Sequence, residues 1–323
     1  MVHQNSPAGA VGQTSRSVRT AVSTLLVCGV ILVAGRQNKT KSPATESPKP
    51  AAPKLGERIQ ITNDGLPKDG LVADRSRLYF IQFPVQGAPR LYAYSIAGGP
   101  GTVIDAAIPK PRILDVSPDS ELLISSGKVG PGDLPLWVVP ASGGAPRRLG
   151  QIRAAAAAWL PDGKLLFSRG RDLYRAEHDG SNPVEVATTP GPISNLRVSP
   201  DGTRIRFTMG DPPRSAIWEA QVDGTGMKPL VPLPGAPAQA CCGRWTPDGK
   251  YFVYESAGDL WMVVGAGPVS NRMNLPVQLT SGSQAYHDPV PASDGQKLFA
   301  IAGARHAADG TRSSEEVYAF DWQ

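Results

Sequence analysis

The sequence predicts an all-β protein: one six-bladed β-propeller of four-stranded blades, preceded by one N-terminal hydrophobic helix. Three observations lead to this prediction. A Pro-Asp-Gly turn motif recurs at intervals of roughly forty to fifty residues, a period typical of propeller blades. Each copy is followed by short β-rich segments. After the hydrophobic stretch, no long segment shows the helical spacing of apolar residues. The 35 glycines and 32 prolines among 323 residues also favour a chain with many tight turns.

The turn motif has three clear copies, at 160–163, 199–202 and 246–249, and weaker copies at 72–75, 117–120 and 292–295. In such a turn proline fixes φ, aspartate hydrogen-bonds back to the backbone, and glycine accepts a positive φ. We therefore interpret the motif aspartates as structural turn residues rather than as a carboxylate cluster. They are Asp119, Asp162, Asp201, Asp248 and Asp294.

The segments after each turn indicate four strands per repeat. An apolar strand such as 204–208 is followed by a strand in which an aromatic residue comes after leucine or isoleucine, as in Ile217-Trp218. We expect that aromatic residue to pack between neighbouring blades. A second glycine-bearing turn then leads to an outer strand such as 277–280. A β-sandwich would explain the strands but not the period, so a propeller is favoured.

The two ends of the repeat region complement each other. Residues 58–62 resemble the outer strand of a blade but have no inner strands before them, and the last repeat ends soon after its third strand, at 316–320. Pairing these two segments would complete the sixth blade and leave no open edge inside the ring. The predicted propeller therefore spans residues 57–323, with the N-terminal strand closing the last blade.

The N-terminal region divides into a short tail (1–19), an uncharged apolar segment (20–35) and a Pro/Lys/Ser-rich tether (36–56) that is too polar to order itself. The apolar segment follows Arg16 and Arg19, as in a secretory signal or a signal anchor. It is short for a hydrocarbon core of roughly 30 Å, and the basic residues after it favour the opposite orientation. Cleavage and orientation therefore stay open, with export favoured.

Composition and motifs argue against several function classes. The net charge of +5 is modest and much of it lies in the tether, so we expect no nucleic-acid binding. No Gly-x-Ser-x-Gly nucleophile motif is present, and the four histidines lack metal-ligand spacing. The sequence predicts a protein that is not an enzyme and has no cofactor or metal.

The innermost strands offer the candidate binding residues, because they line the channel of a propeller. These candidates are Asp115, Asn195, Arg197, Arg244 and Asp288. The neighbouring Cys241 and Cys242 have two interpretations. We favour buried small apolar side chains, and the alternative is a disulfide between adjacent residues with a redox role.

The repeats resemble those of TolB-like, WD-like propellers of bacterial envelopes. Segments 111–117, 136–140 and 241–252 further resemble acidobacterial membrane-anchored propeller proteins, many of which carry a cytoplasmic winged-helix or kinase domain before the membrane span. Here 19 residues precede the apolar segment, so we expect the chain to be a shortened relative of these proteins.

The resemblance implies a monomeric propeller in the periplasm, anchored in the inner membrane through residues 20–35, that binds an envelope protein or polymer. A cleaved and secreted form is an alternative location. A sensor that has lost its cytoplasmic domain is the alternative function. The propeller of a prolyl-oligopeptidase-like peptidase is the third interpretation.

Overall fold

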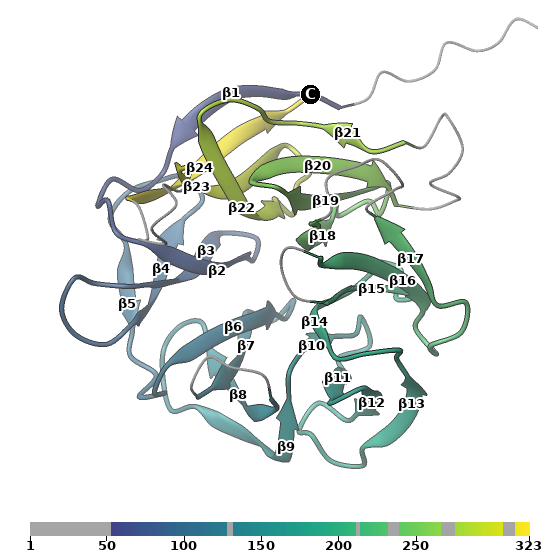
Figure 1. Ribbon diagram of the computed structural model, residues 1–323. Helices are drawn as coiled ribbons and strands as arrows, with labels where there is room; N and C mark the ends of the chain where they lie inside the picture. Colours follow the sequence, from purple (N-terminus) through teal and green to yellow (C-terminus); the bar gives the residue numbers. More distant parts are fainter. Residues whose placement is uncertain (1–52, 128–131, 211–213, 232–238, 266–274, 306–313) are drawn as a thin grey trace, which may run out of the picture. The chain divides into compact units, whose positions relative to one another are not determined.

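The computed structural model describes residues 53–127, 132–210, 214–231, 239–265, 275–305 and 314–323. Within them, 24 strands form six four-stranded antiparallel sheets arranged around a common axis (Figure 1). These residues belong to one compact unit, 51–323. The predicted tail, apolar helix and most of the tether lie outside the described residues. Among the residues that are described, no helix is long and apolar enough to cross a membrane.

The blades follow one another along the chain. Blade 1 consists of β2 (Lys68–Ala73), β3 (Arg77–Gln82), β4 (Arg90–Ser95) and β5 (Thr102–Ile104). Blade 2 consists of β6 (Pro111–Val116), β7 (Glu121–Ser126), β8 (Leu134–Pro140) and β9 (Arg147–Ala154). Blade 3 consists of β10 (Ala157–Trp159), β11 (Leu165–Arg169), β12 (Asp172–Ala176) and β13 (Val184–Thr188).

The remaining blades have the same order. Blade 4 consists of β14 (Ile193–Val198), β15 (Arg204–Met209), β16 (Ala216–Gln221) and β17 (Lys228–Val231). Blade 5 consists of β18 (Cys241–Trp245), β19 (Tyr251–Ser256), β20 (Asp259–Val264) and β21 (Val277–Gln278). Blade 6 consists of β22 (Gln284–Pro291), β23 (Lys297–Ala304), β24 (Glu315–Trp322) and, from the other end of the chain, β1 (Leu55–Gln60).

Both faces of the second strand of each sheet are buried, because every blade is packed between two others. In β3, Tyr79 and Ile81 belong to the apolar cluster between blades 1 and 2, whereas Phe80 belongs to the cluster between blades 1 and 6. This explains why the second strand of a blade is a continuous apolar run rather than an alternating one. Equivalent clusters fill the other four blade interfaces.

The predicted packing of the third-strand aromatic residues is confirmed for several blades. Tyr174, Trp218 and Trp261 lie partly buried against the clusters between blades 2 and 3, 3 and 4, and 4 and 5, respectively. The preceding residue points to the opposite face, since Leu173 lies in the cluster between blades 3 and 4. Large rings thus fill the outer part of the wedge between blades.

The turn motif connects the first and second strands of each blade. In the copy at 199–202, the Gly202 amide donates to the Ser199 carbonyl (2.8 Å), and Asp201 Oδ1 accepts from the Thr203 amide (3.0 Å). Asp162, Asp248 and Asp294 accept from the backbone in the same way. The hydroxyls of Ser199 and Thr203 and the Thr203 amide lower the pKa of Asp201 to about 2.

The innermost strands are irregular in five blades: the register of β6 shifts between Ile113 and Asp115, and four other innermost strands carry a wider β-bulge. The register shifts between Asp69 and Val72 in β2, and at the equivalent places in β14, β18 and β22. The first bulged residue has a positive φ in each case: Gly70 (70°), Asn195 (49°), Cys242 (58°) and Asp288 (49°). A bulge of this kind redirects side chains, and here it places polar groups around the axis of the ring.

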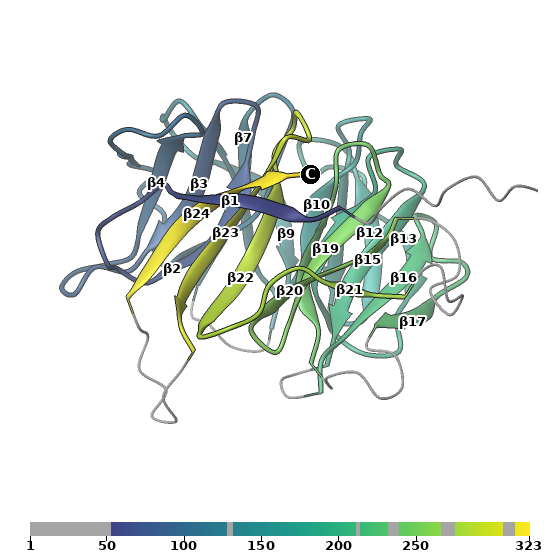
Figure 2. The same cartoon turned by 90° about the horizontal axis from the view of Figure 1, so that it is seen from above.

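The ring closes as predicted, with β1 antiparallel to β24 as the outer strand of blade 6 (Figures 1 and 2). Arg58 is opposite Phe320, and Gln60 is opposite Tyr318. The strand was expected at 58–62 but spans Leu55–Gln60. Beyond it the pairing continues through one backbone bond, from the Ile61 amide to the Val317 carbonyl (2.8 Å), and through the Thr62 hydroxyl, which accepts from the Val317 amide (2.9 Å).

Lys68 lies at the centre of a second set of contacts between the two chain ends, which we call the closure clamp (Asp64, Lys68, Glu315 and Glu316). The fully buried Lys68 Nζ contacts Asp64 Oδ1 (2.7 Å), the Glu315 carbonyl (2.6 Å) and Glu316 Oε2 (3.4 Å). Glu316 also accepts from the Thr62 hydroxyl (2.5 Å). A buried cation is tolerated only where such partners replace its water.

We predict that Lys68→Met destabilises the propeller by about 3 kcal/mol, because it leaves the carboxylates of the clamp without their buried cation. Lys164→Met is the matched control, since the pair between Lys164 and Glu177 is largely exposed (36% and 47%) and should cost less than about 1 kcal/mol. Urea unfolding measures both free energies. Equal losses for the two variants would contradict the assigned role of the clamp.

Candidate functional site

The bulged innermost strands bring a group of polar residues together near the axis. We call it the axial cluster: Asp115, Asn195, Arg197, Cys241, Cys242, Arg244, Glu255, His287 and Asp288. It contains all five residues that the sequence suggested. The cluster has two parts, an arginine-rich part between β6, β14 and β18, and a second part around Cys241–Cys242 on β18, β19 and β22.

The arginine-rich part bridges the ring across its axis. Arg244 of blade 5 forms an ion pair with Asp115 of the opposite blade 2 (Nη1 to Oδ1, 3.3 Å). The other oxygen of Asp115 accepts from the Trp159 amide of blade 3 (3.0 Å). Arg197 of blade 4 donates to the Leu114 carbonyl of blade 2 (2.9 Å). Four blades are thus linked at one point, and part of the polarity of these residues is satisfied within the protein.

Arg197 is the least compensated charge of this group. Its Nη1 donates to two backbone carbonyls, those of Leu114 and Leu196, and its buried Nε has no hydrogen-bond partner among the described residues. Burial, which has the largest effect, and the neighbouring Arg244 together lower the pKa of Arg197 to about 9, against the attraction of Asp115 and Asp288. An additional anion at this point would therefore be stabilised.

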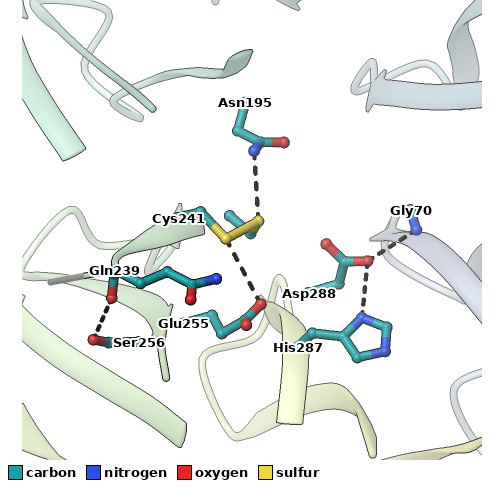
Figure 3. The surroundings of a disulfide bond; sticks show 9 residues. Gly70, Asn195, Gln239, Cys241, Glu255, Ser256, His287 and Asp288 are labelled. Atoms are coloured by element: carbon teal, nitrogen blue, oxygen red, sulfur yellow. Dashed lines mark hydrogen bonds and ion pairs between the residues drawn. A yellow bond between two sulfur atoms is a disulfide. The ribbon is translucent and has the colours of Figure 1, made fainter. Parts of the chain in front are cut away.

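The second part contains a histidine between two carboxylates. His287 Nδ1 lies 3.4 Å from Asp288 Oδ2, and its Nε2 lies 3.5 Å from Glu315 Oε1. Burial alone would lower the pKa of His287, but Asp288 and Glu315 raise it well above its ordinary value. Asp288 also accepts from the Gly70 amide of blade 1 (2.9 Å), which fixes the carboxylate between two blades (Figure 3).

Cys241 and Cys242 form a disulfide between adjacent residues (Figure 3). The expectation of two buried apolar thiols was therefore wrong. Successive side chains of a regular strand point to opposite faces, but the positive φ of Cys242 (58°) turns its side chain toward that of Cys241. Asn195 Nδ2 donates to Cys242 Sγ (3.5 Å), and Glu255 Oε2 lies 3.7 Å from Cys241 Sγ.

Glu255 is opposite Cys241 in the pairing of β18 with β19. Burial raises the pKa of Glu255 to about 7; His287 opposes this rise and Asp288 adds to it. The Sγ atoms of Cys241 and Cys242 and a carboxylate oxygen of Glu255 lie within 4.8 Å of one another, a spacing that suits a metal ion. In the disulfide form, however, the sulfurs are bonded to each other and offer no thiolate ligands.

Sequence reasoning missed Glu255, His287 and Glu315. Glu255 is the second-last residue of β19 and follows an apolar run, and only the register with Cys241 shows what it faces. His287 immediately precedes the bulged Asp288, as Cys241 precedes Cys242. Gly, Asn and Asp at corresponding places of several repeats, residue types that accept a positive φ, could have indicated the bulge and therefore its neighbours.

A hollow of about 460 Å³ lies between blades 2 and 3, away from the axial cluster residues, and is lined in part by the turn residue Asp119. Here His178 Nε2 lies 2.9 Å from Glu121 Oε2, and its ring lies over Trp159. The nearby Ser120 hydroxyl donates to Asp74 of blade 1 (2.7 Å) rather than to the histidine. This arrangement does not assemble a serine nucleophile with its base.

Comparisons with known proteins agree with the fold. No family model matches the chain. An uncharacterised protein of Agrobacterium fabrum is 27% identical over 179 residues, which cover 51% of this chain and 59% of that protein. The chain thus matches little more than half the length of this relative.

Solved structures resemble the chain more completely. TolB from Acinetobacter baumannii superposes with a TM-score of 0.55 at 16% identity, over 78% of this chain and 65% of that one. The PQQ-bound aldose sugar dehydrogenase from Streptomyces coelicolor superposes with a TM-score of 0.56 at 12% identity, over 85% and 100%. The likeness is one of fold. The propeller is TolB-like, and because its neighbours include enzymes, the fold does not decide between binding and catalysis.

We predict that Glu255→Gln changes the pH dependence of stability. Since the folded-state pKa of Glu255 is raised from 4.5 to about 7, its stabilising contribution is complete below 4.5 and is lost as the pH rises through 7. Glutamine never ionises, so the variant should be more stable than the wild type by about 1 to 2 kcal/mol at about pH 8. Urea unfolding at several pH values tests this. A difference that is independent of pH would contradict it.

Proposed function

We propose that this protein is a non-enzymatic, envelope-anchored β-propeller that acts as a binding scaffold and recognises an anionic group of its ligand at the axial cluster. The observation that supports this most directly is the incomplete hydrogen bonding of the Arg197 guanidinium. Arg197 is partly buried. Among the described residues, its guanidinium donates to the backbone carbonyls of Leu114 and Leu196, and its buried Nε has no hydrogen-bond partner.

The surroundings of Arg197 favour an anion over other ligands. Asp115 is already engaged by Arg244 and by the Trp159 amide, and Asp288 is engaged by the Gly70 amide and His287. The fixed carboxylates of the cluster therefore have partners of their own. Guanidinium groups bind carboxylates and phosphates with charge-assisted hydrogen bonds, which are worth roughly twice a neutral one.

A binding role agrees better with this geometry than catalysis does. The polar groups near the axis form ion pairs and backbone hydrogen bonds that connect different blades, and such contacts hold a site rigid. The serine and histidine of the hollow between blades 2 and 3 have separate partners. The chain is also TolB-like in fold, which is consistent with the proposed scaffold.

The anion preference can be tested with peptides that carry a free C-terminal carboxylate, with their C-terminal amides, and with acetate and phosphate. We expect carboxylates to stabilise the protein in a thermal-shift assay, and the amides to lose this effect. Arg197→Gln should weaken binding at least about tenfold. Arg148→Gln, on the exposed outer strand β9, is the control. Stabilisation that is equal for carboxylate and amide, or absent for every anion, would overturn the proposed recognition.

The envelope location is a separate part of the proposal and rests on the uncharged segment 20–35 and the polar tether after it. A C-terminally tagged chain should fractionate with membranes and should be digested when protease is added outside the inner membrane. A cleaved form would instead be soluble outside the cytoplasm and shortened at its N-terminus. A propeller protected in the cytoplasm would contradict the envelope role without affecting ligand recognition.

A further inference from the structure

The disulfide of the axial cluster joins two residues that are not fully enclosed by the protein. Cys241 and Cys242 are both only partly buried, on the innermost strand of blade 5. They lie at the bulge of β18, where Cys242 has a positive φ. A structural disulfide usually joins segments that are distant along the chain and closes a loop. This one closes no loop between elements, so its contribution to holding the fold is small.

In a hydrogen bond between Glu255 and Cys241, the chemistry of the disulfide determines which group is the donor. A disulfide sulfur has no hydrogen to donate, so a hydrogen bond over the 3.7 Å between Glu255 Oε2 and Cys241 Sγ requires a protonated carboxyl group as the donor. The raised pKa of Glu255, about 7, keeps a large fraction of that group protonated near neutral pH. Cys241 therefore has a proton source beside it, and Cys242 has the amide of Asn195 (3.5 Å) (Figure 3).

We propose that Cys241–Cys242 is a reversible two-electron thiol–disulfide exchange site, with Glu255 as the proton donor to Cys241 and a small-molecule dithiol as the reductant. This site is independent of anion binding at Arg197. The reacting atoms are those of the disulfide and of the Glu255 carboxyl group.

The exchange proceeds in two balanced steps. A thiolate of the reductant attacks Cys242 Sγ and forms a mixed disulfide; the Cys241–Cys242 bond breaks, and Cys241 leaves as a thiolate that takes the proton of Glu255. The second thiol of the reductant, as a thiolate, then attacks the reductant sulfur that is bonded to Cys242 Sγ in the mixed disulfide. Cys242 leaves as a thiolate beside the Asn195 amide and is protonated by solvent. The reductant ends as a cyclic disulfide, and its two protons replace those consumed.

The groups that surround Glu255 determine its proton affinity. His287 and Asp288 face it from β22, and Cys241 faces it from β18. The acidic residue of β20, Asp259, forms an ion pair with Arg305 (2.5 Å). On β18, the cation of Arg244 forms an ion pair with Asp115. The pKa of the Glu255 carboxyl group is therefore set mainly by burial and by the His287–Asp288 pair.

The first measurement establishes the redox state in the full chain. Protein purified without reductant is unfolded in an alkylating agent, and its peptides are analysed by mass spectrometry. We expect the Cys241–Cys242 peptide to be unmodified and lighter by two hydrogen atoms. After treatment of the native protein with dithiothreitol, both cysteines should be alkylated, and oxidised dithiothreitol should restore the disulfide. Alkylation of both cysteines before reduction, or reduction only after unfolding, would overturn the proposal.

The second measurement tests Glu255. The rate of reduction by dithiothreitol is compared between the wild type and Glu255→Gln across pH, so that the ionisation of the reductant cancels in the ratio. At about pH 6 we expect the wild type to react about tenfold faster. The ratio should fall to one or below as the pH rises through about 7, because the carboxylate then has no proton to give and repels the incoming thiolate.

Glu177→Gln is the matched control, because Glu177 is an exposed glutamate of blade 3 that pairs with Lys164. It should react at the wild-type rate at every pH. If the ratio of the wild-type rate to the Glu255→Gln rate stays constant across pH, Glu255 is not the proton donor. Far-ultraviolet circular dichroism of each variant confirms that rates are compared between folded proteins.

Discussion

The whole ring depends on the contact between its two ends, β1 on β24. A propeller blade has no core of its own, since its apolar side chains are buried only against the neighbouring blades. Opening one junction would therefore expose two apolar sheet faces and leave a strand edge unpaired. Here the junction is held by main-chain pairing and by the closure clamp around Lys68. The clamp adds a charge requirement, because its buried cation is stable only while the carboxylates of both chain ends are present.

A second buried cation that is compensated by a carboxylate lies at the junction between blades 4 and 5. Arg206 is fully buried and contacts Glu219 through two nitrogens (2.9 and 2.6 Å), while its guanidinium lies 4.1 Å from the ring centre of Trp245. Burial lowers the pKa of Arg206 to about 10, against the attraction of Glu219. An arginine between aromatic rings and a carboxylate connects two blades without the flexibility of a lysine.

The inner surface of the ring is organised by backbone conformation rather than by any sequence motif. Bulges in four innermost strands give positive φ to residues as different as Gly70, Asn195, Cys242 and Asp288. Each bulge turns its neighbours toward the axis, where side chains from opposite blades meet. The anion site proposed at Arg197 and the exchange site proposed at Cys241–Cys242 are both consequences of this geometry. They use different atoms of one cluster, so each can be tested without the other.

The sequence by itself determined the architecture. Each local pattern, from the Pro-Asp-Gly turn to the aromatic residue of the third strand, repeats with the period of one blade, and the unmatched strand near residue 58 specified how the ring closes. These features are local or periodic, so they can be recognised without coordinates. The five polar residues on innermost strands were found for the same reason, since their place in the repeat predicts their place near the axis.

Only the tertiary structure decided what those residues contact. The pairing of Arg244 with Asp115 joins blades on opposite sides of the ring, and no sequence pattern encodes a contact over that separation. The approach of Cys241 to Cys242 depends on one dihedral angle at a bulge, and the role of Glu255 depends on the register of β18 with β19. The period of the sequence specifies the blades, whereas the dihedral angles and side-chain contacts at the axis exist only once the blades are assembled.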